Sequence, residues 1–282
     1  AAAEKRGDST GNKVTVRGTA SISGTVYGGL TDVAGGKATN NEVTVEKSIA
    51  GAVLGGQSAG DATGNRVFIN ANSGAVTGGK AVGEASGNIV TVGSVTVSSI
   101  TGGAGATTKD NTVNIDGTTV TNRIVGGTQA DGTGNTLNVK GQNAAQNIGG
   151  FQKVAFNTNG VAANGTMLNL TGGAQTNVDW TTLTVTGTAE KPLTLLKNES
   201  GIDLAGYTGA AKSETTDTTE TNVDVRKNND GKVTEITYEG YQFARAASES
   251  VIGTDAYGGI SRAGNATHDN VITVADGTHT NV

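Results

Sequence analysis

Short runs of alternating apolar and polar residues recur along the first half of the chain. In the run NRVFI at 65–69, Val67 and Ile69 alternate with Arg66 and Phe68. Side chains of a strand point alternately to its two faces, so this pattern predicts a strand with one buried face. Equivalent runs begin at Asn12, Asn41, Asn65, Asn88, Asn111 and Asn135, at spacings of 23 to 29 residues.

Pairs of glycine keep the same period as the asparagine runs. The pairs are Gly28 and Gly29, Gly55 and Gly56, Gly78 and Gly79, Gly102 and Gly103, Gly126 and Gly127, and Gly149 and Gly150. A second apolar segment stands before most pairs, at Val26, Val53, Val76, Ile100 and Ile124. Two independent markers with one period predict an all-β fold, a β-solenoid with about one coil for each repeat of 23–24 residues.

The repeated residue types have physical reasons in such a coil. Glycine permits sharp corners and positive φ angles, so we expect the pairs to lie at corners. The asparagine at each strand entrance is expected to stack on its neighbours as a ladder of side-chain amides. Proline would remove one hydrogen bond from a ladder that every coil needs, and the chain has a single proline.

The repeat divides the chain into three regions. Residues 1–150 are the glycine-rich solenoid repeats. Residues 151–250 lack the glycine period and carry larger apolar residues, with strands predicted at 183–187 and 192–196. We interpret this less regular β-rich segment as a capping or recognition module. Residues 251–282 resume the repeat, which we expect to continue past Val282.

Three further local predictions concern the second region. The polar stretch 211–221 is expected to be an exposed loop. Residues 223–239 predict a β-hairpin that turns at Asn229, Asp230 and Gly231. Residues 244–250 are the one stretch that suggests a short helix.

Composition excludes several classes of protein. The 45 glycines show no three-residue period, so collagen is excluded. The absence of cysteine removes disulfides, thiolate catalysis and zinc–thiolate sites. Twenty basic against 25 acidic residues argue against nucleic acid as a partner. The sequence has no apolar stretch of the length that a membrane-spanning helix needs, so we expect no membrane insertion.

Residues that could carry chemistry are few. His268 and His279 lack an accompanying nucleophile pattern and are interpreted as exposed loop residues. Asp61, Glu84 and Asp131 each stand four residues before a repeat asparagine and could bind Ca²⁺ between coils. The series is broken at the equivalent position in another coil, so solvated turn residues are the preferred interpretation, and we expect no metal, cofactor or catalytic site.

Aromatic residues could stack on sugars, but the repeat does not align them into a groove. They are Trp180, Tyr207, Tyr238, Tyr241, Tyr27 and Tyr257. Trp180 is expected in the core of the second region. Because the sequence shows no dense cluster of carboxylates, a carbohydrate-active enzyme is the weakest of the functions considered.

Several phrases of the sequence resemble a known family. VYGG at 26–29, GDATGNRVFI at 60–69, GEASGNIVTV at 83–92 and DGTGNTLNV at 131–139 resemble the repeats of Gram-negative (type V) autotransporter passengers. NIGGFQKVAFN at 147–157 and NGTMLNLTGGA at 164–174 are similar to the segment that follows those arrays. The resemblance covers residues 12–174 well and 175–250 loosely.

This resemblance implies an extracellular passenger on the bacterial surface, built as a parallel β-helix that we expect to be right-handed. Such passengers are often adhesins, so we expect attachment to host cells or matrix through an unidentified surface protein or glycan. A rod that binds copies of itself and aggregates bacteria is the alternative, and a carbohydrate-active β-helix enzyme is the second alternative.

Overall fold

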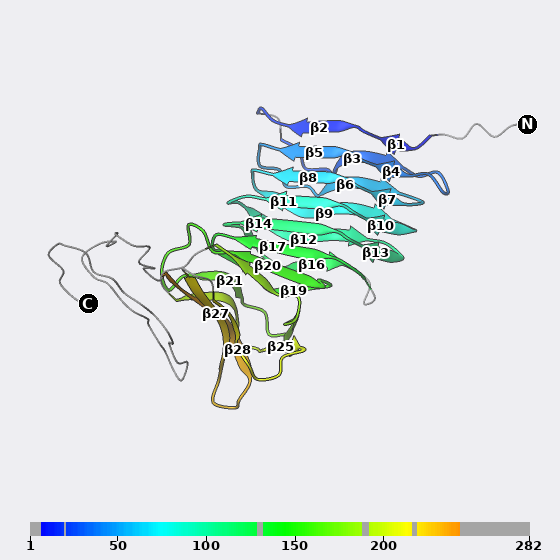
Figure 1. Ribbon diagram of the computed structural model, residues 1–282. Coiled ribbons are helices and arrows are strands. Elements are labelled where there is room, and N and C mark those ends of the chain that lie inside the picture. The colour runs from blue at the N-terminus through cyan, green and yellow to red at the C-terminus, as the bar shows by residue number, and fades with distance from the viewer. Residues whose placement is uncertain (1–6, 20, 129–131, 188–191, 216–218, 243–282) are drawn as a thin grey trace, which may run out of the picture.

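The chain folds as a parallel β-solenoid, seen in a computed structural model as a stack of flat coils (Figure 1). The structure describes residues 7–19, 21–128, 132–187, 192–215 and 219–242. Within these ranges every regular element is a β-strand, and no helix occurs. The all-β solenoid that the repeat predicts is therefore confirmed. The predicted helix at 244–250 and the resumed repeat at 251–282 lie outside the described residues.

Each coil contributes one strand to an eight-stranded parallel sheet. Its strands are β2 (Lys13–Val16), β5 (Glu42–Val45), β8 (Arg66–Ile69), β11 (Ile89–Val92), β14 (Thr112–Asp116), β17 (Thr136–Lys140), β20 (Lys153–Asn157) and β23 (Thr184–Thr186). The first six begin one residue after a repeat asparagine. The predicted strand at 183–187 is β23, so it joins the same sheet as the repeats.

Two further sheets complete the early coils. The five-stranded sheet consists of β1 (Ser9–Thr10), β4 (Ala38–Thr39), β7 (Ala62–Thr63), β10 (Glu84–Ser86) and β13 (Thr107–Lys109). A larger sheet of thirteen strands receives β3 (Val26–Thr31), β6 (Val53–Ser58), β9 (Ser73–Ala81), β12 (Thr96–Ala104), β15 (Thr119–Val120), β16 (Arg123–Gly127), β18 (Asn143–Ala145), β19 (Asn147–Gly149), β21 (Thr166–Leu170) and β24 (Leu193–Asn198).

The sequence repeat ends at Gly150, but the parallel stacking continues beyond it. Strand β20 pairs with β17, and β24 pairs with β21, both in parallel. A separate two-stranded parallel sheet adds β22 (Thr176–Asp179) and β25 (Ile202–Ala205).

An antiparallel unit covers the end of this stack. It consists of β26 (Lys212–Thr215), β27 (Thr219–Lys227) and β28 (Val233–Gln242), and β28 pairs with β24. The predicted hairpin at 223–239 is confirmed by β27 and β28. The loop expected at 211–221 is wrong in part, because residues 212–215 form a strand that pairs with β27. Its polar composition fits an exposed edge strand.

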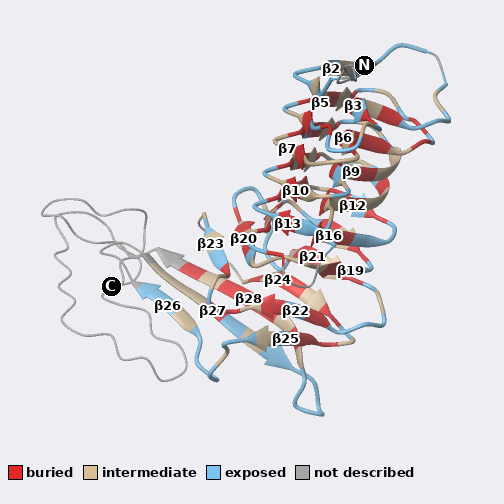
Figure 2. Cartoon of the chain, turned by 90° about the vertical axis from the view of Figure 1, so that its right-hand side faces the viewer, coloured by how far each residue is buried: buried red, intermediate tan, exposed pale blue. Residues whose placement is uncertain are grey.

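The core is a set of columns of branched side chains between the sheets. The register of the eight-stranded sheet places Val43, Val67, Val90, Val113 and Leu137 one above another, all with no exposed surface. Later coils fill a wider interior with larger residues such as Phe156 and Met167. Figure 2 shows the buried positions continuing from the stacked strands into β28, where Ile236 and Tyr238 are buried.

The first five glycine pairs lie inside strands and not at corners with positive φ, whereas Gly150 of the sixth pair follows β19 with a φ of +66°. A Cβ on Gly78 would stand 2.5 Å from the carbonyl oxygen of Gly102 in the next coil. One on Gly79 would stand 2.5 Å from Nδ2 of Asn88. The pairs from Gly28 to Gly127 have no positive φ, so the expectation of corner glycines was wrong for these five pairs; close approach of backbones is the reason for them. Positive φ occurs instead just before the repeat asparagines, as at Gly64 and Gly87.

Candidate functional site

The repeat asparagines are the residues that the sequence singled out most clearly. Asn41, Asn65, Asn88, Asn111 and Asn135 have no exposed surface. Each donates through its backbone N–H and its Nδ2 to Oδ1 of the asparagine in the following coil, where one follows. For Asn65 these distances to Asn88 are 3.1 and 2.9 Å. Gln152 ends the series by accepting the N–H of Asn135 through Oε1 at 3.0 Å.

This ladder holds the corner between the five-stranded and the eight-stranded sheet. Nδ2 of Asn88 also donates to the carbonyl oxygen of Ala62 at 3.0 Å, which ties three coils together. Side chains that are fully buried cannot contact a ligand. The repeat asparagines and glycine pairs therefore build the scaffold, and binding residues must lie on the outward faces.

One outward column on the eight-stranded sheet carries hydroxyl and amide groups. The register aligns Phe68, Thr91, Asn114, Asn138 and Ala155 on successive strands. Nδ2 of Asn138 donates to Oδ1 of Asn114 at 2.7 Å, and Nδ2 of Asn114 donates to Oγ1 of Thr91 at 3.1 Å. These bonds fix each amide in one orientation, so its remaining donors and acceptors face solvent in a defined pattern.

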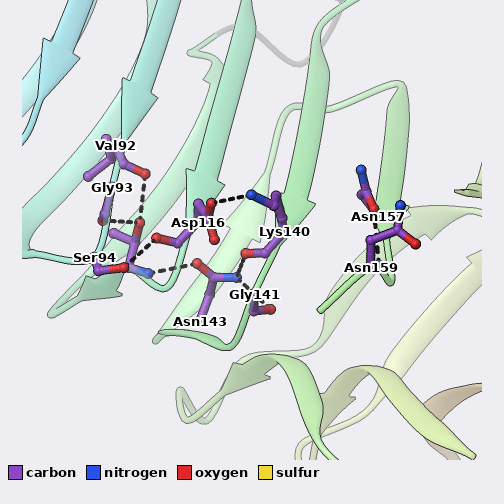
Figure 3. Close-up of polar contacts among 10 residues, drawn as sticks. Val92, Gly93, Ser94, Asp116, Lys140, Gly141, Asn143, Asn157 and Asn159 are labelled. Carbon is purple, nitrogen blue, oxygen red and sulfur yellow. Dashed lines mark hydrogen bonds and ion pairs between the residues drawn. The ribbon is translucent and has the colours of Figure 1, made fainter. Parts of the chain in front are cut away.

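A second outward column runs beside the first at the ends of the same strands. It aligns Asp116, Lys140, Asn157 and Thr186. Nζ of Lys140 lies 2.9 Å from Oδ2 of Asp116, and both side chains are about half exposed (Figure 3). Oδ1 of Asn157 accepts the backbone N–H of Asn159 at 3.1 Å, which fixes the position of the Asn157 side chain.

A buried pair of polar residues holds the corner under this second column (Figure 3). Oδ1 of Asn143 accepts the N–H of Thr118 at 2.8 Å, and Nδ2 of Asn143 donates to the carbonyl oxygens of Lys140 and Met167 at 2.8 and 3.0 Å. Oγ1 of Thr118 donates to the carbonyl oxygen of Val92 at 3.0 Å. The backbone that carries the Asp116–Lys140 pair is thereby fixed from inside.

Between the two columns lies a shallow groove of about 490 Å³. Its polar walls are Thr91, Asn114, Asp116, Asn138, Lys140, Asn157 and Thr186. Ala155 contributes only a methyl group at a position where Asn138 stands one coil earlier, and this small side chain helps to hollow the sheet face. Apolar atoms make up most of the accessible lining, and the amides, hydroxyls and one ion pair stand on the walls, where they can donate and accept hydrogen bonds. We call it the polar groove below.

The other candidate functional residues from the sequence do not lie together in one site. Oδ1 of Asp61 accepts the N–H of Glu84 in the next coil at 3.0 Å, and Glu84 lies in β10 and not in a turn. No group of three or more metal-ligating side chains occurs in the described ranges. Asp131, His268, His279 and Tyr257 lie outside them.

The aromatic residues are split between two regions. Tyr27 is half-buried on β3, whereas Trp180, Tyr207 and Tyr238 lie at the junction of the solenoid and the antiparallel unit. Trp180 is 5% exposed, which confirms it as a core residue. Its ring centroid lies 5.1 Å from that of Tyr207 at 73°, and Nζ of Lys212 lies 5.3 Å from its centroid. Burial lowers the pKa of Lys212, and the charge of Asp179 partly opposes that shift.

No family model matches the sequence, and no curated protein or solved structure matches it. None of the described residues forms a helix long and apolar enough to cross a membrane. The resemblance to autotransporter passengers stays a prediction that rests on the repeat phrases.

The polar groove could not be found from the sequence alone. Its members differ from coil to coil, so the repeat hides them. The one available signal is the shared outward asparagine in the runs NTVNI and NTLNV, at Asn114 and Asn138. Their contact became visible only when the register placed the two strands side by side.

Proposed function

We propose that this chain is the passenger region of a bacterial surface adhesin, which attaches to host cells or matrix by binding and without catalysis. The observation that carries the proposal is the polar groove, in which amides, hydroxyls and one ion pair stand in fixed columns on a stacked scaffold. Such a surface recognises hydrogen-bonding partners such as glycans or polar protein surfaces.

The solenoid supplies the stiffness that a surface-displayed rod requires. Every coil pairs with its neighbours through parallel sheets, and the buried asparagine ladder connects the same coils at one corner. Eight strands at a spacing of about 4.8 Å give a rod roughly 34 Å long. The absence of cysteine is compatible with export of the unfolded chain through a narrow pore.

The chemistry of the polar groove favours binding over hydrolysis. Most glycosidases use two carboxyl groups on either side of the scissile bond. Among the residues that line the groove only Asp116 carries a carboxylate, and Lys140 is paired with it. A shallow groove of this kind gives weak affinity per site, which many copies on one cell surface multiply.

The proposal is tested by coating beads with the full chain and counting attachment to cultured epithelial cells. Bead-to-bead clumping is scored in the same wells. Attachment without clumping is the expected result. Clumping without attachment would replace the proposal by self-association, and release of reducing sugar from a polysaccharide would replace it by an enzyme.

A further inference from the structure

A second hollow, of about 610 Å³, opens where the path of the coils changes. After β19 the chain runs through residues 150–152 directly into β20, without a strand of the five-stranded sheet. The next coil inserts residues 171–175 before β22, and β22 pairs with β25 rather than with β19. The space between β19 and β22 is therefore not closed by strand pairing.

Buried amides hold the inserted segment as a fixed wall of this hollow. Nδ2 of Asn147 donates to the carbonyl oxygens of Ala174 and Gln175 at 3.3 and 3.5 Å, and the hydroxyl of Thr176 donates to Oδ1 of Asn147. Nδ2 of Asn198 donates to the carbonyl oxygen of Ala174 at 3.1 Å and to Oγ1 of Thr176 at 2.9 Å. Asn198 and Thr176 have no exposed surface, so the wall is anchored from the core.

Arg123 places a positive charge at this hollow. Its side chain is exposed, and it lines the hollow from the first residue of β16. A Cβ on Gly149 would stand 3.2 Å from Nη2 of Arg123, so the absence of a side chain there makes room for the guanidinium. None of the described residues that line the hollow is acidic, and Arg123 forms no ion pair within the described ranges.

The remaining lining groups are amides and one aromatic ring. Gln146, Gln175 and Asn177 are exposed at the hollow and can bond hydroxyl groups. Phe151 is half-buried against Gly126 and offers part of its ring to the hollow. A volume of this size lies within the usual range for small-molecule sites.

We propose that this hollow binds an acidic saccharide, a sugar residue that carries a carboxylate. The planar guanidinium of Arg123 matches a carboxylate with two parallel hydrogen bonds. The amides bond the sugar hydroxyls, and the ring of Phe151 packs against the apolar C–H face of the sugar. This hollow is a second site, distinct from the polar groove, and binding in the hollow does not depend on binding in the groove.

Titration calorimetry of the full chain at low salt tests this inference. The carboxylated probes are 3′-sialyllactose and a hyaluronan tetrasaccharide, with lactose as the neutral probe and hexaglutamate as the acidic peptide. At least one carboxylated sugar is expected to bind tenfold or more tightly than lactose, with an affinity that falls as salt rises. The proposal would be overturned if hexaglutamate bound and neither carboxylated sugar did. It would also be overturned if lactose bound as tightly as both acidic sugars.

Two variants locate the binding. Arg123→Gln is expected to lower the affinity for the carboxylated sugar at least tenfold, and Gly149→Ala to weaken it by displacing the guanidinium. Arg66→Gln removes the same charge from an exposed position on β8 and is expected to leave binding unchanged. Equal loss in the two arginine variants would contradict a site at Arg123. If the sugars do not bind but coated beads still attach to cells, this inference fails while the proposed function stands.

Discussion

Nδ2 of Asn88 lies 2.9 Å from Oδ1 of Asn111, and neither side chain has any exposed surface. The same Oδ1 accepts the backbone N–H of Asn88 at 3.1 Å. One asparagine thus satisfies two donors of the preceding coil. Buried polar groups that lose their partners cost about 1–3 kcal/mol each. The ladder is therefore expected to stabilise the stack at each coil that it joins.

Asn111→Ala is expected to lower the free energy of unfolding by about 3 kcal/mol, because the backbone N–H of Asn88 and one of its two Nδ2 hydrogens lose their acceptor inside the protein, while Nδ2 keeps its bond to Ala62. Asn114→Ala is the matched control three residues away on the outward face, with an expected loss below about 1 kcal/mol. Chemical denaturation followed by circular dichroism compares the two variants. Similar losses would show that the ladder has no special role.

Gly78→Ala is expected to destabilise the stack by about 2 kcal/mol or more, since the new Cβ would stand 2.5 Å from the carbonyl oxygen of Gly102 and 2.9 Å from Cβ of Asn88. Neither neighbour can move without breaking the coil above. At Gly93 the nearest atom to an added Cβ is 3.8 Å away, and φ is not positive. Gly93→Ala should therefore change stability by less than about 1 kcal/mol. Thermal and urea unfolding of both variants test the close-approach explanation.

Tyr238 links the antiparallel unit to the solenoid, and its hydroxyl donates to the carbonyl oxygen of Gly187 at 3.0 Å. Tyr238→Phe is expected to cost about 1 kcal/mol near neutral pH through the loss of this bond. Tyr27→Phe, on a half-buried residue of β3 for which no hydrogen bond is seen in the described ranges, serves as the control. Urea unfolding at pH 7 measures the difference, and an equal effect of both changes would remove this role of Tyr238.

Tyr238 is also expected to make folding stability depend on pH in the alkaline range. Burial, and then the negative charge of Glu214, raise the pKa of Tyr238 above its ordinary value of 10.0. The folded state therefore keeps its proton to higher pH than the unfolded state does. The resulting stability is fully present below about pH 10 and is lost as pH rises through the raised pKa. Stability should fall less steeply between pH 9.5 and 11 in Tyr238→Phe than in the parent, and parallel curves would contradict this.

Asp179 is expected to make folding stability depend on pH in the acid range. Hydrogen bonds to its carboxylate from the hydroxyl of Thr181, at 2.7 Å, and from the backbone of Thr181, at 2.8 Å, lower its pKa below the ordinary value of 3.8. This contribution to stability is present above about pH 4 and is lost as pH falls through the lowered pKa. The difference in stability between the parent and Asp179→Asn is expected to shrink from pH 5 to pH 2.5. A difference that stays constant over that range would contradict the assignment.

The coil architecture could be predicted from the sequence because equivalent positions in every coil need the same kind of side chain. A column such as Val43, Val67 and Val90 needs the same apolar shape each time, so its period is visible in the letters. The glycine pairs are visible in the sequence, but the physical requirement for glycine is not. That requirement is the close approach of backbones in adjacent coils, which depends on neighbours about 24 residues away. Gly78 and Gly102 show this directly.

The outward surface was less predictable because nothing forces it to repeat. The polar groove depends on the register that places Asn138 beside Asn114 and on the small side chain of Ala155 in the next strand. The hollow at Arg123 depends on a change in the path of the chain after Gly149. Neither feature has a period, and both became visible only when the strands were placed in space.

The most direct measurement compares three forms of the full chain on beads that are presented to epithelial cells. Asn114→Ala/Asn138→Ala removes two amides from the polar groove, whereas Gln57→Ala/Gln142→Ala removes two amides from positions that do not line it. Circular dichroism first establishes that all three are folded. The account predicts that the groove variant attaches at least fivefold less than the parent and that the control attaches as the parent does. Equal attachment of all three, or none by the parent, would contradict it.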